Sequence, residues 1–167
     1  MKHYAKLLKN GLPLMVMVLL MSTACEKNDG PVDTTTLRVL EANLLESANL
    51  FNSALRERNT EHSFEILDIK RSDNILKVKV RGGGSEELFR FIWDGRIQES
   101  HPMGIMLVLK YDNSAGDFDL NNELVISVNL EKILVNAKNL QDYHFYVLNG
   151  SKVQQKRLNP DGSVTDK

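Results

Sequence analysis

The polar loop at residues 111–123, YDNSAGDFDLNNE, holds the oxygen-bearing side chains whose spacing best suits a cation. Asp117, Asp119 and Asn121 alternate along the chain, and short loops wrap calcium with side-chain oxygens spaced in this way. An EF-hand needs glycine at its sixth position, which is Asn122 when the loop starts at Asp117. We therefore expect a solvated turn, with calcium held by Asp117, Asp119 and Asn121 as the alternative.

Other carboxylates could in principle act as an acid and a base on a glycosidic bond. Glu86-Glu87 is one such pair, and Asp117 with Asp119 is another. Adjacent or alternate carboxylates on loops are common solvated charges, and their spacing alone does not define a hydrolase site. We expect no catalytic residue among them.

The histidines His62, His101 and His144 stand at no recognised spacing from a serine or an acid. Neither G-x-S-x-G nor H-E-x-x-H occurs in the sequence. We expect His101 in a loop and His144 on the surface of a strand, with a metal site built from the three histidines as the alternative. The sequence therefore predicts no cofactor and no enzymatic activity.

Two other features favour structural roles. Gly82-Gly83-Gly84 is followed by neither Lys-Ser/Thr nor a helix start, which excludes a phosphate loop and favours a bend or bulge between strands. Trp93, the only tryptophan, could stack on a sugar, but it shares a strand face with Phe89 and Phe91. We expect Trp93 in the core.

Cys25, the only cysteine, ends a pattern typical of secretion signals. Residues 1–9 carry three lysines, residues 11–21 are apolar, and Ser22-Thr23-Ala24 are small. The fourteen residues 11–24 are too few to span about 30 Å of hydrocarbon. We therefore expect residues 1–24 to be a cleaved signal peptide.

The small residues before Cys25 resemble the lipobox of bacterial lipoproteins, with Ser22 where the best-known lipoboxes have leucine. The resemblance implies cleavage between Ala24 and Cys25 and acyl chains such as palmitate on Cys25, which would hold the protein on a membrane. Glu26 after the cysteine is similar to the sorting pattern of the cell outer membrane. The alternative is a secreted protein with an unpaired thiol.

Charge limits the class of partner. Removing the three lysines of residues 1–24 leaves 18 Lys+Arg against 22 Asp+Glu, a net charge near −4. The sequence contains no basic patch interleaved with aromatic residues, which is the pattern typical of nucleic-acid binding. We expect no nucleic-acid partner, contact with the membrane through the lipid on Cys25, and an envelope protein or glycan of unknown identity as the ligand.

The mature chain of 143 residues is long enough for one domain. We expect a flexible tether at 25–33, around Gly30-Pro31, followed by an amphipathic helix at 34–60, where apolar residues recur at steps of three and four. Asp33-Thr34-Thr35 resembles a short O-glycosylation motif. We expect the β domain at 61–160 and a tail at 161–167.

Alternating apolar residues predict seven or eight strands after residue 61. The expected strands are 63–71, 75–81, 87–93, a short one at 96–99 after a turn at Asp94-Gly95, 105–111, 123–130, and a hairpin at 142–158 turning at Asn149-Gly150. This number of short strands predicts an antiparallel immunoglobulin-like β-sandwich preceded by one amphipathic helix. A barrel is the alternative.

Four stretches between residues 64 and 130, NILKVKVRGGG, FRFIWDG, ESHP and LVLKYDNSAGD, resemble a group of small uncharacterised β-sandwich lipoproteins of Gram-negative bacteria. Ser85 and Asp119 stand near positions where members of that group often carry cysteines, so the disulfide that such cysteines could form is lost here. The resemblance implies a fold and an envelope location but no activity. We expect a non-enzymatic binding or accessory module, with a small envelope or glycan hydrolase that uses loop carboxylates as the alternative.

Overall fold

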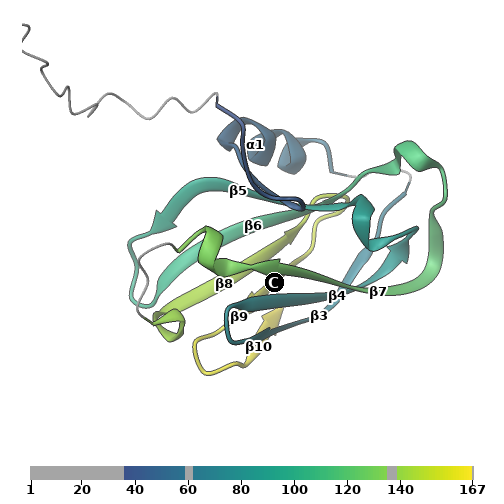
Figure 1. The fold of residues 1–167 in the computed structure, drawn as a ribbon. Helices are drawn as coiled ribbons and strands as arrows, with labels where there is room; N and C mark the ends of the chain where they lie inside the picture. The colour runs from purple at the N-terminus through teal and green to yellow at the C-terminus, as the bar shows by residue number, and fades with distance from the viewer. Residues whose placement is uncertain (1–35, 59–61, 135–138, 167) are drawn as a thin grey trace, which may run out of the picture. The chain divides into compact units, whose positions relative to one another are not determined.

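The computed structural model describes residues 36–58, 62–134 and 139–166, which all lie in the unit Asp33–Lys167. The fold of these residues is mainly β, with ten strands in two sheets and one α-helix, α1 (Ala48–Arg56) (Figure 1). The strands are β1 (Arg38–Glu41), β2 (Leu44–Glu46), β3 (Glu65–Ser72), β4 (Ile75–Gly83), β5 (Phe89–Gln98), β6 (Met103–Tyr111), β7 (Asp119–Asn129), β8 (Tyr143–Asn149), β9 (Gln155–Leu158) and β10 (Val164–Asp166). The 3-10 helices are η1 (Glu86–Leu88), η2 (Asn113–Ala115), η3 (Leu130–Lys132) and η4 (Leu140–Asp142).

The larger sheet has seven strands in the order β1-β2-β5-β6-β8-β9-β10, and the smaller one has the order β3-β4-β7. The prediction of purely antiparallel pairing is wrong at two places, because β2–β5 and β6–β8 are parallel. Between β6 and β8 the chain forms β7, which pairs with β4 in the smaller sheet. The chain therefore crosses between sheets after β6 and returns in the same direction as β8.

One apolar core is shared by both sheets. On β4, Leu76, Val78 and Val80 are fully buried while the lysines between them are exposed, as the alternation predicts. Buried side chains of the larger sheet belong to the same core cluster, including Phe91 on β5 and Phe145 on β8. The predicted inward faces of the central strands are therefore confirmed.

The outer face of the larger sheet carries a second apolar cluster beneath α1. Phe51 and Ala54 of the helix are buried together with Ile92, Val108 and Leu148, which lie on β5, β6 and β8. The three central strands are therefore covered on both faces. Neither α1 nor any other helix in the described ranges is long and apolar enough to cross a membrane.

The helix predicted for residues 34–60 is much shorter in the structure. Arg38–Glu41 and Leu44–Glu46 are strands, and the helix begins only after Ser47, whose hydroxyl accepts the backbone N–H of Leu50. Leu44 is fully buried in the sheet core and pairs with Phe91 of β5. Its spacing from neighbouring leucines matches a helix, but pairing with the sheet overrides that weak local preference.

The turn expected at Asp94-Gly95 is instead an irregularity inside one long strand. β5 continues from Phe89 to Gln98, and its register with β6 shifts between Trp93 and Ile97. Gly95 has a positive φ of 82°, and the Asp94 carboxylate accepts the backbone N–H of Arg96. Turns and β-bulges both use glycine at positions of positive φ, so the sequence Asp94-Gly95 does not distinguish a turn from a bulge.

The predicted hairpin around Asn149 is confirmed, since β8 and β9 pair antiparallel and are joined by residues 150–154. Gly150 has an ordinary φ, and it is needed for a close approach: an added Cβ would lie 2.8 Å from the Leu109 carbonyl oxygen. The predicted tail also contains structure, because β10 pairs with β9. The sheets therefore extend beyond the expected range 61–160 at both ends.

The turn between β8 and β9 binds the beginning of β3 through side chains. Asn149 is fully buried, and its amide donates to the Phe64 carbonyl at 2.8 Å, while the Ser151 hydroxyl accepts the Phe64 N–H at 3.1 Å. The Gln154 side chain both accepts the N–H of Ile66 and donates to its carbonyl. These side chains take the place of a neighbouring strand.

We expect Asn149→Ala to lower the free energy of unfolding by about 2–3 kcal/mol, because it leaves buried backbone groups without partners. Urea denaturation followed by circular dichroism measures the change. Val153→Ala in the same turn is the control, since Val153 is 81% exposed. Equal stability of the two variants would show that the Asn149 network contributes nothing.

Candidate functional site

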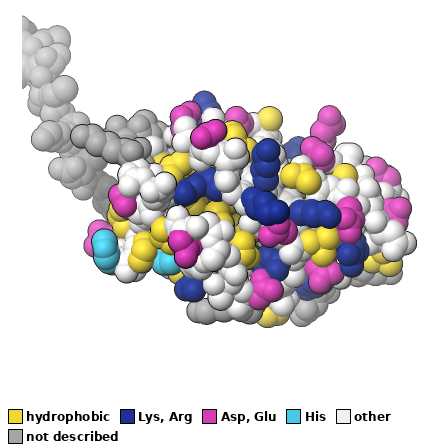
Figure 2. All heavy atoms as spheres, turned by 90° about the horizontal axis from the view of Figure 1, so that it is seen from below, with side chains coloured by type: hydrophobic (Ala, Val, Ile, Leu, Met, Phe, Trp, Pro, Cys, Tyr) yellow, Lys and Arg dark blue, Asp and Glu magenta, His cyan; other side chains and the backbone are white. Residues whose placement is uncertain are grey.

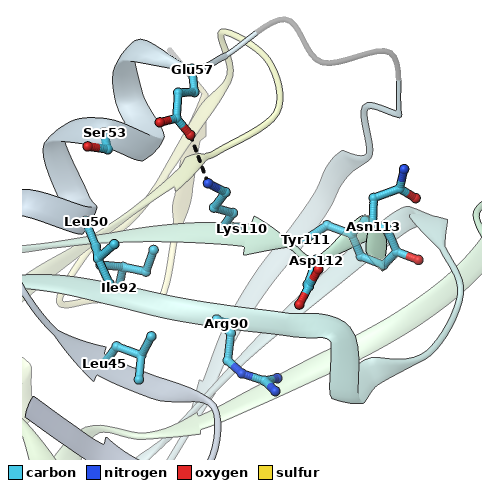
Figure 3. Close-up of a pocket in the computed structure, with 10 residues that line it drawn as sticks. All are labelled: Leu45, Leu50, Ser53, Glu57, Arg90, Ile92, Lys110, Tyr111, Asp112 and Asn113. Carbon is cyan, nitrogen blue, oxygen red and sulfur yellow. Dashed lines mark hydrogen bonds and ion pairs between the residues drawn. The ribbon is translucent and has the colours of Figure 1, made fainter. Parts of the chain in front are cut away.

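A groove of about 540 Å³ opens beside α1 on the outer side of the larger sheet (Figure 3). Its walls come from β2, α1, β5 and β6 and from the residues that follow β6. The lining residues are Leu45, Leu50, Ser53, Glu57, Arg90, Ile92, Lys110, Tyr111, Asp112 and Asn113. The volume lies in the range of small-molecule sites in proteins.

One part of the groove is aliphatic. The parallel pairing of β2 with β5 places Leu45 directly beside Ile92, and Leu50 reaches toward them from the first turn of α1 (Figure 3). Ile92 is almost fully buried, whereas Leu50 remains 39% exposed. These three side chains offer an apolar surface without polar groups, on which a ligand could bury hydrocarbon.

Two cations lie next to this apolar surface. Arg90 of β5 and Lys110 of β6 are paired in the antiparallel ladder, and their side chains point apart, that of Lys110 toward Glu57 and that of Arg90 away from it (Figure 3). Lys110 forms an ion pair with Glu57 at the end of α1, with 3.1 Å between Nζ and Oε2. Arg90 donates to the carbonyls of Glu87 and Phe89, and no ion pair within the described ranges includes it.

Asp112 contributes a negative charge at the far end of the groove. Its carboxylate accepts the backbone N–H of Ser114 at 3.0 Å. Hydrogen bonds from Ser114, and to a smaller extent the charges of Arg90 and Lys110, hold the pKa of Asp112 below its ordinary value. The carboxylate is therefore ionised at neutral pH and is engaged by its own turn.

A second hollow of about 220 Å³ continues the groove toward the turn between β8 and β9. The two hollows share Glu57, Lys110, Tyr111 and Asn113. The second is closed by His62, Gly150 and Ser151, and the His62 ring hydrogen-bonds the Asn113 amide. The ion pair of Glu57 with Lys110 therefore stands where the hollows meet.

The candidate calcium ligands turn to separate partners. The carboxylate of Asp117 lies over Gly84 and accepts the Tyr111 hydroxyl at 3.3 Å, while that of Asp119 accepts the backbone N–H of Asn121. Among the described residues no three His, Cys, Asp or Glu side chains gather closely enough to hold a metal ion. Cys25 and Ala24, the predicted lipidation and cleavage residues, lie outside these ranges.

The other sequence candidates are dispersed. His62 lies at the second hollow, His101 is exposed before Pro102, and His144 is half-buried on β8. Glu86 and Glu87 are exposed in η1. The structure does not bring these groups into one site.

The expected core position of Trp93 and the expected bulge at the glycines of β4 are both confirmed. Trp93 is 7% exposed in the core, and its indole donates to the Arg96 carbonyl. The register of β4 with β7 shifts between Arg81 and Gly83, where Gly82 and Gly83 have positive φ.

The groove itself was not foreseen from the sequence. Glu57, Arg90 and Lys110 are ordinary charged residues that lie far apart in the chain. Only the pairing of β5 with β6 and the packing of α1 bring them together. The one available signal is that Arg90 interrupts the apolar run Phe89–Trp93 and Lys110 the apolar run Met103–Tyr111.

On the face of the molecule drawn in Figure 2, charges of opposite sign are mixed. Seen from the side on which β3, β9 and β10 lie in Figure 1, Lys and Arg side chains stand beside Asp and Glu (Figure 2). Lys70, for example, pairs with Asp68, with 3.0 Å between Nζ and Oδ2. This mixed surface gives no reason to place a charged macromolecular partner there.

Comparison of the chain with protein-family models, with curated proteins and with solved structures finds no match. The candidate site therefore stands on its geometry alone.

We expect the stability of the domain to fall as the pH rises above 10.0, the ordinary pKa of tyrosine. Burial, and secondarily the charge of Asp117, raises the pKa of Tyr111, whereas the hydrogen bond from Gly84 opposes the shift. The unfolded chain therefore loses this proton first, and the stabilisation disappears as the pH rises through the folded pKa. Urea melts at several alkaline pH values measure it.

Tyr111→Phe should flatten this pH dependence, because Phe cannot ionise. Tyr146→Phe, at a half-buried position on the outer face, is the matched control. The same alkaline slope in Tyr111→Phe and in the unmodified protein would contradict the assignment.

Proposed function

We propose that this chain is a bacterial lipoprotein, anchored in the envelope through lipid on Cys25, that binds a ligand in the groove beside α1 without turning it over. The observation that carries the proposal is the groove: an aliphatic surface next to a pair of cations, on strands that are buried on both faces. Sites for small ligands combine apolar walls with a few placed polar groups in this way.

The anchor and the location rest on the sequence. The basic start, the apolar run and the small residues before Cys25 support a cleaved lipoprotein signal, and Glu26 supports the outer membrane. The polar residues that follow support a tether. The ligand would then be captured close to the membrane, from the periplasmic or the external side.

We also propose that the two sheets form an immunoglobulin-like β-sandwich. Two facing sheets around one core support an immunoglobulin-like sandwich, to which α1 and two parallel strand pairs are added. Membership in the group of small β-sandwich lipoproteins of Gram-negative bacteria is supported by the WDG segment at residues 93–95 together with Ser100 and Pro102.

A hydrolase that uses loop carboxylates has weaker support. Asp117 and Asp119 turn to different partners, so they do not flank a common space as the two carboxylates of a glycosidase do. We therefore favour binding without catalysis.

We expect Cys25→Ala to leave the domain folded and to release it from membranes, because the acyl chains are lost. Detergent-phase partitioning and incorporation of labelled palmitate into the full chain are the measurements, with the thermal melt as the folding control. Persistent partitioning of Cys25→Ala into the detergent phase would contradict the anchor.

We expect small organic fragments of different charge to shift the amide signals of groove residues in NMR titrations of the mature domain. Ser53→Trp should abolish these shifts, because Ser53 lines the groove and a tryptophan would fill it. Asn52→Trp, at the preceding and exposed position of α1, is the matched control. Shifts confined to other surfaces, or no shifts with any fragment, would remove the groove as the binding site.

A further inference from the structure

We propose that an apolar row on the outer face of the larger sheet rests on the surface of the lipid bilayer that anchors the chain. The row consists of Val39, Leu45 and Ile92 on three neighbouring strands, with Leu50 of α1 beside them. This inference rests on the proposed lipid anchor at Cys25, because the tether is what brings the domain to the membrane. Four steps support it.

The first step is that the row is continuous. Val39 of β1 is paired with Leu45 of β2, and Leu45 is paired with Ile92 of β5, so the three side chains point to the same face of the sheet. Leu50 reaches toward Leu45 and Ile92 from the first turn of α1 (Figure 3). The aliphatic wall of the groove therefore continues across β2 to β1, the outermost strand on that side of the described sheet.

The second step is that the outer end of the row is uncovered. Ile92 is almost fully buried beneath α1, whereas Val39 is 67% exposed and Leu50 is also exposed. Leu37, which stands just before β1, is 52% exposed. Single exposed apolar side chains are common on protein surfaces, but neighbouring ones that form a patch mark contact with a protein or a membrane.

The third step is the short distance along the chain from the row to the expected anchor. The described residues begin at residue 36, three residues before Val39, and residues 25–36 are joined by eleven peptide units. A fully extended chain of this length spans at most about 40 Å. A lipid on Cys25 therefore keeps the β1 edge close to the bilayer. At the resulting effective concentration, a weak apolar contact is enough for docking.

The fourth step concerns charge. Arg38, next to Val39 in β1, is paired with Glu46, with 2.8 Å between Nη1 and Oε2, and Lys110 in the groove is paired with Glu57. The face drawn in Figure 2 carries mixed charges, and it lies on the side of β3, β9 and β10, away from α1 (Figure 1). Docking through the apolar row would leave that charged face in water.

The test uses the mature lipidated chain, placed in nanodiscs of phosphatidylcholine that contain a small share of nitroxide-labelled lipid. The nitroxide broadens the NMR signals of amides that lie near the bilayer. We expect the strongest broadening at the amides of β1 and of the first turn of α1, and the weakest at β3, β9 and β10. Nanodiscs without labelled lipid provide the reference signals.

Val39→Asp and Leu50→Asp should each remove this preferential broadening, because a carboxylate does not enter an apolar contact. Leu50 lies in the first turn of α1, where an acidic side chain favours the helix, so this variant should stay folded. Val164→Asp is the matched control and should keep the broadening, since Val164 is 38% exposed on β10, the opposite edge strand of the same sheet. Thermal melts verify the folding of all three variants.

Each other outcome overturns a distinct statement. Equal broadening over the whole domain would show that it hangs freely from its tether, and broadening centred on another face would show that a different surface docks. Either result refutes the apolar row and leaves the anchor standing. Signals of β1 that shift with protein concentration in the absence of lipid would show that the row binds a second copy of the chain instead. Failure of the proposed anchor is a separate result, seen as detergent-phase partitioning of Cys25→Ala.

Discussion

The burial of β5, β6 and β8 on both faces is the constraint on which the rest of the structure depends. Their inward residues fill the core between the two sheets, and their outward residues Ile92, Val108 and Leu148 need a cover of their own. The short helix α1 provides it with Phe51 and Ala54. Because α1 has only nine residues, the cover ends early, and the exposed remainder of the outer face becomes the groove.

The groove inherits its chemistry from the same strands. Where the helix covers them, the outward positions are apolar, and one step beyond they become Arg90 and Lys110. Glu57, at the end of the helix, reaches the second of these cations. The boundary between apolar packing and charged surface therefore runs through the groove.

The sequence predicts those parts of the fold in which one face is buried and the other is solvated. The alternation on β4 predicts its inward residues, because the positions between them hold Lys77, Lys79 and Arg81. The strands β1 and β2 are too short to show an alternating pattern, and the spacing of their leucines predicts a helix instead. Strand pairing leaves no local signal, and for that reason the parallel pairs, the register of Arg90 with Lys110 and hence the groove could not be predicted.

The turn that follows β8 also affects whether the edge strand β3 can pair with another molecule at high protein concentration. A strand at the edge of a sheet carries free backbone groups that can pair with another molecule and begin aggregation. At the start of β3, the backbone groups of Phe64 and Ile66 are already bonded to Asn149, Ser151 and Gln154. That end of the edge is therefore closed to a strand from a second copy of the chain, which limits aggregation through this sheet.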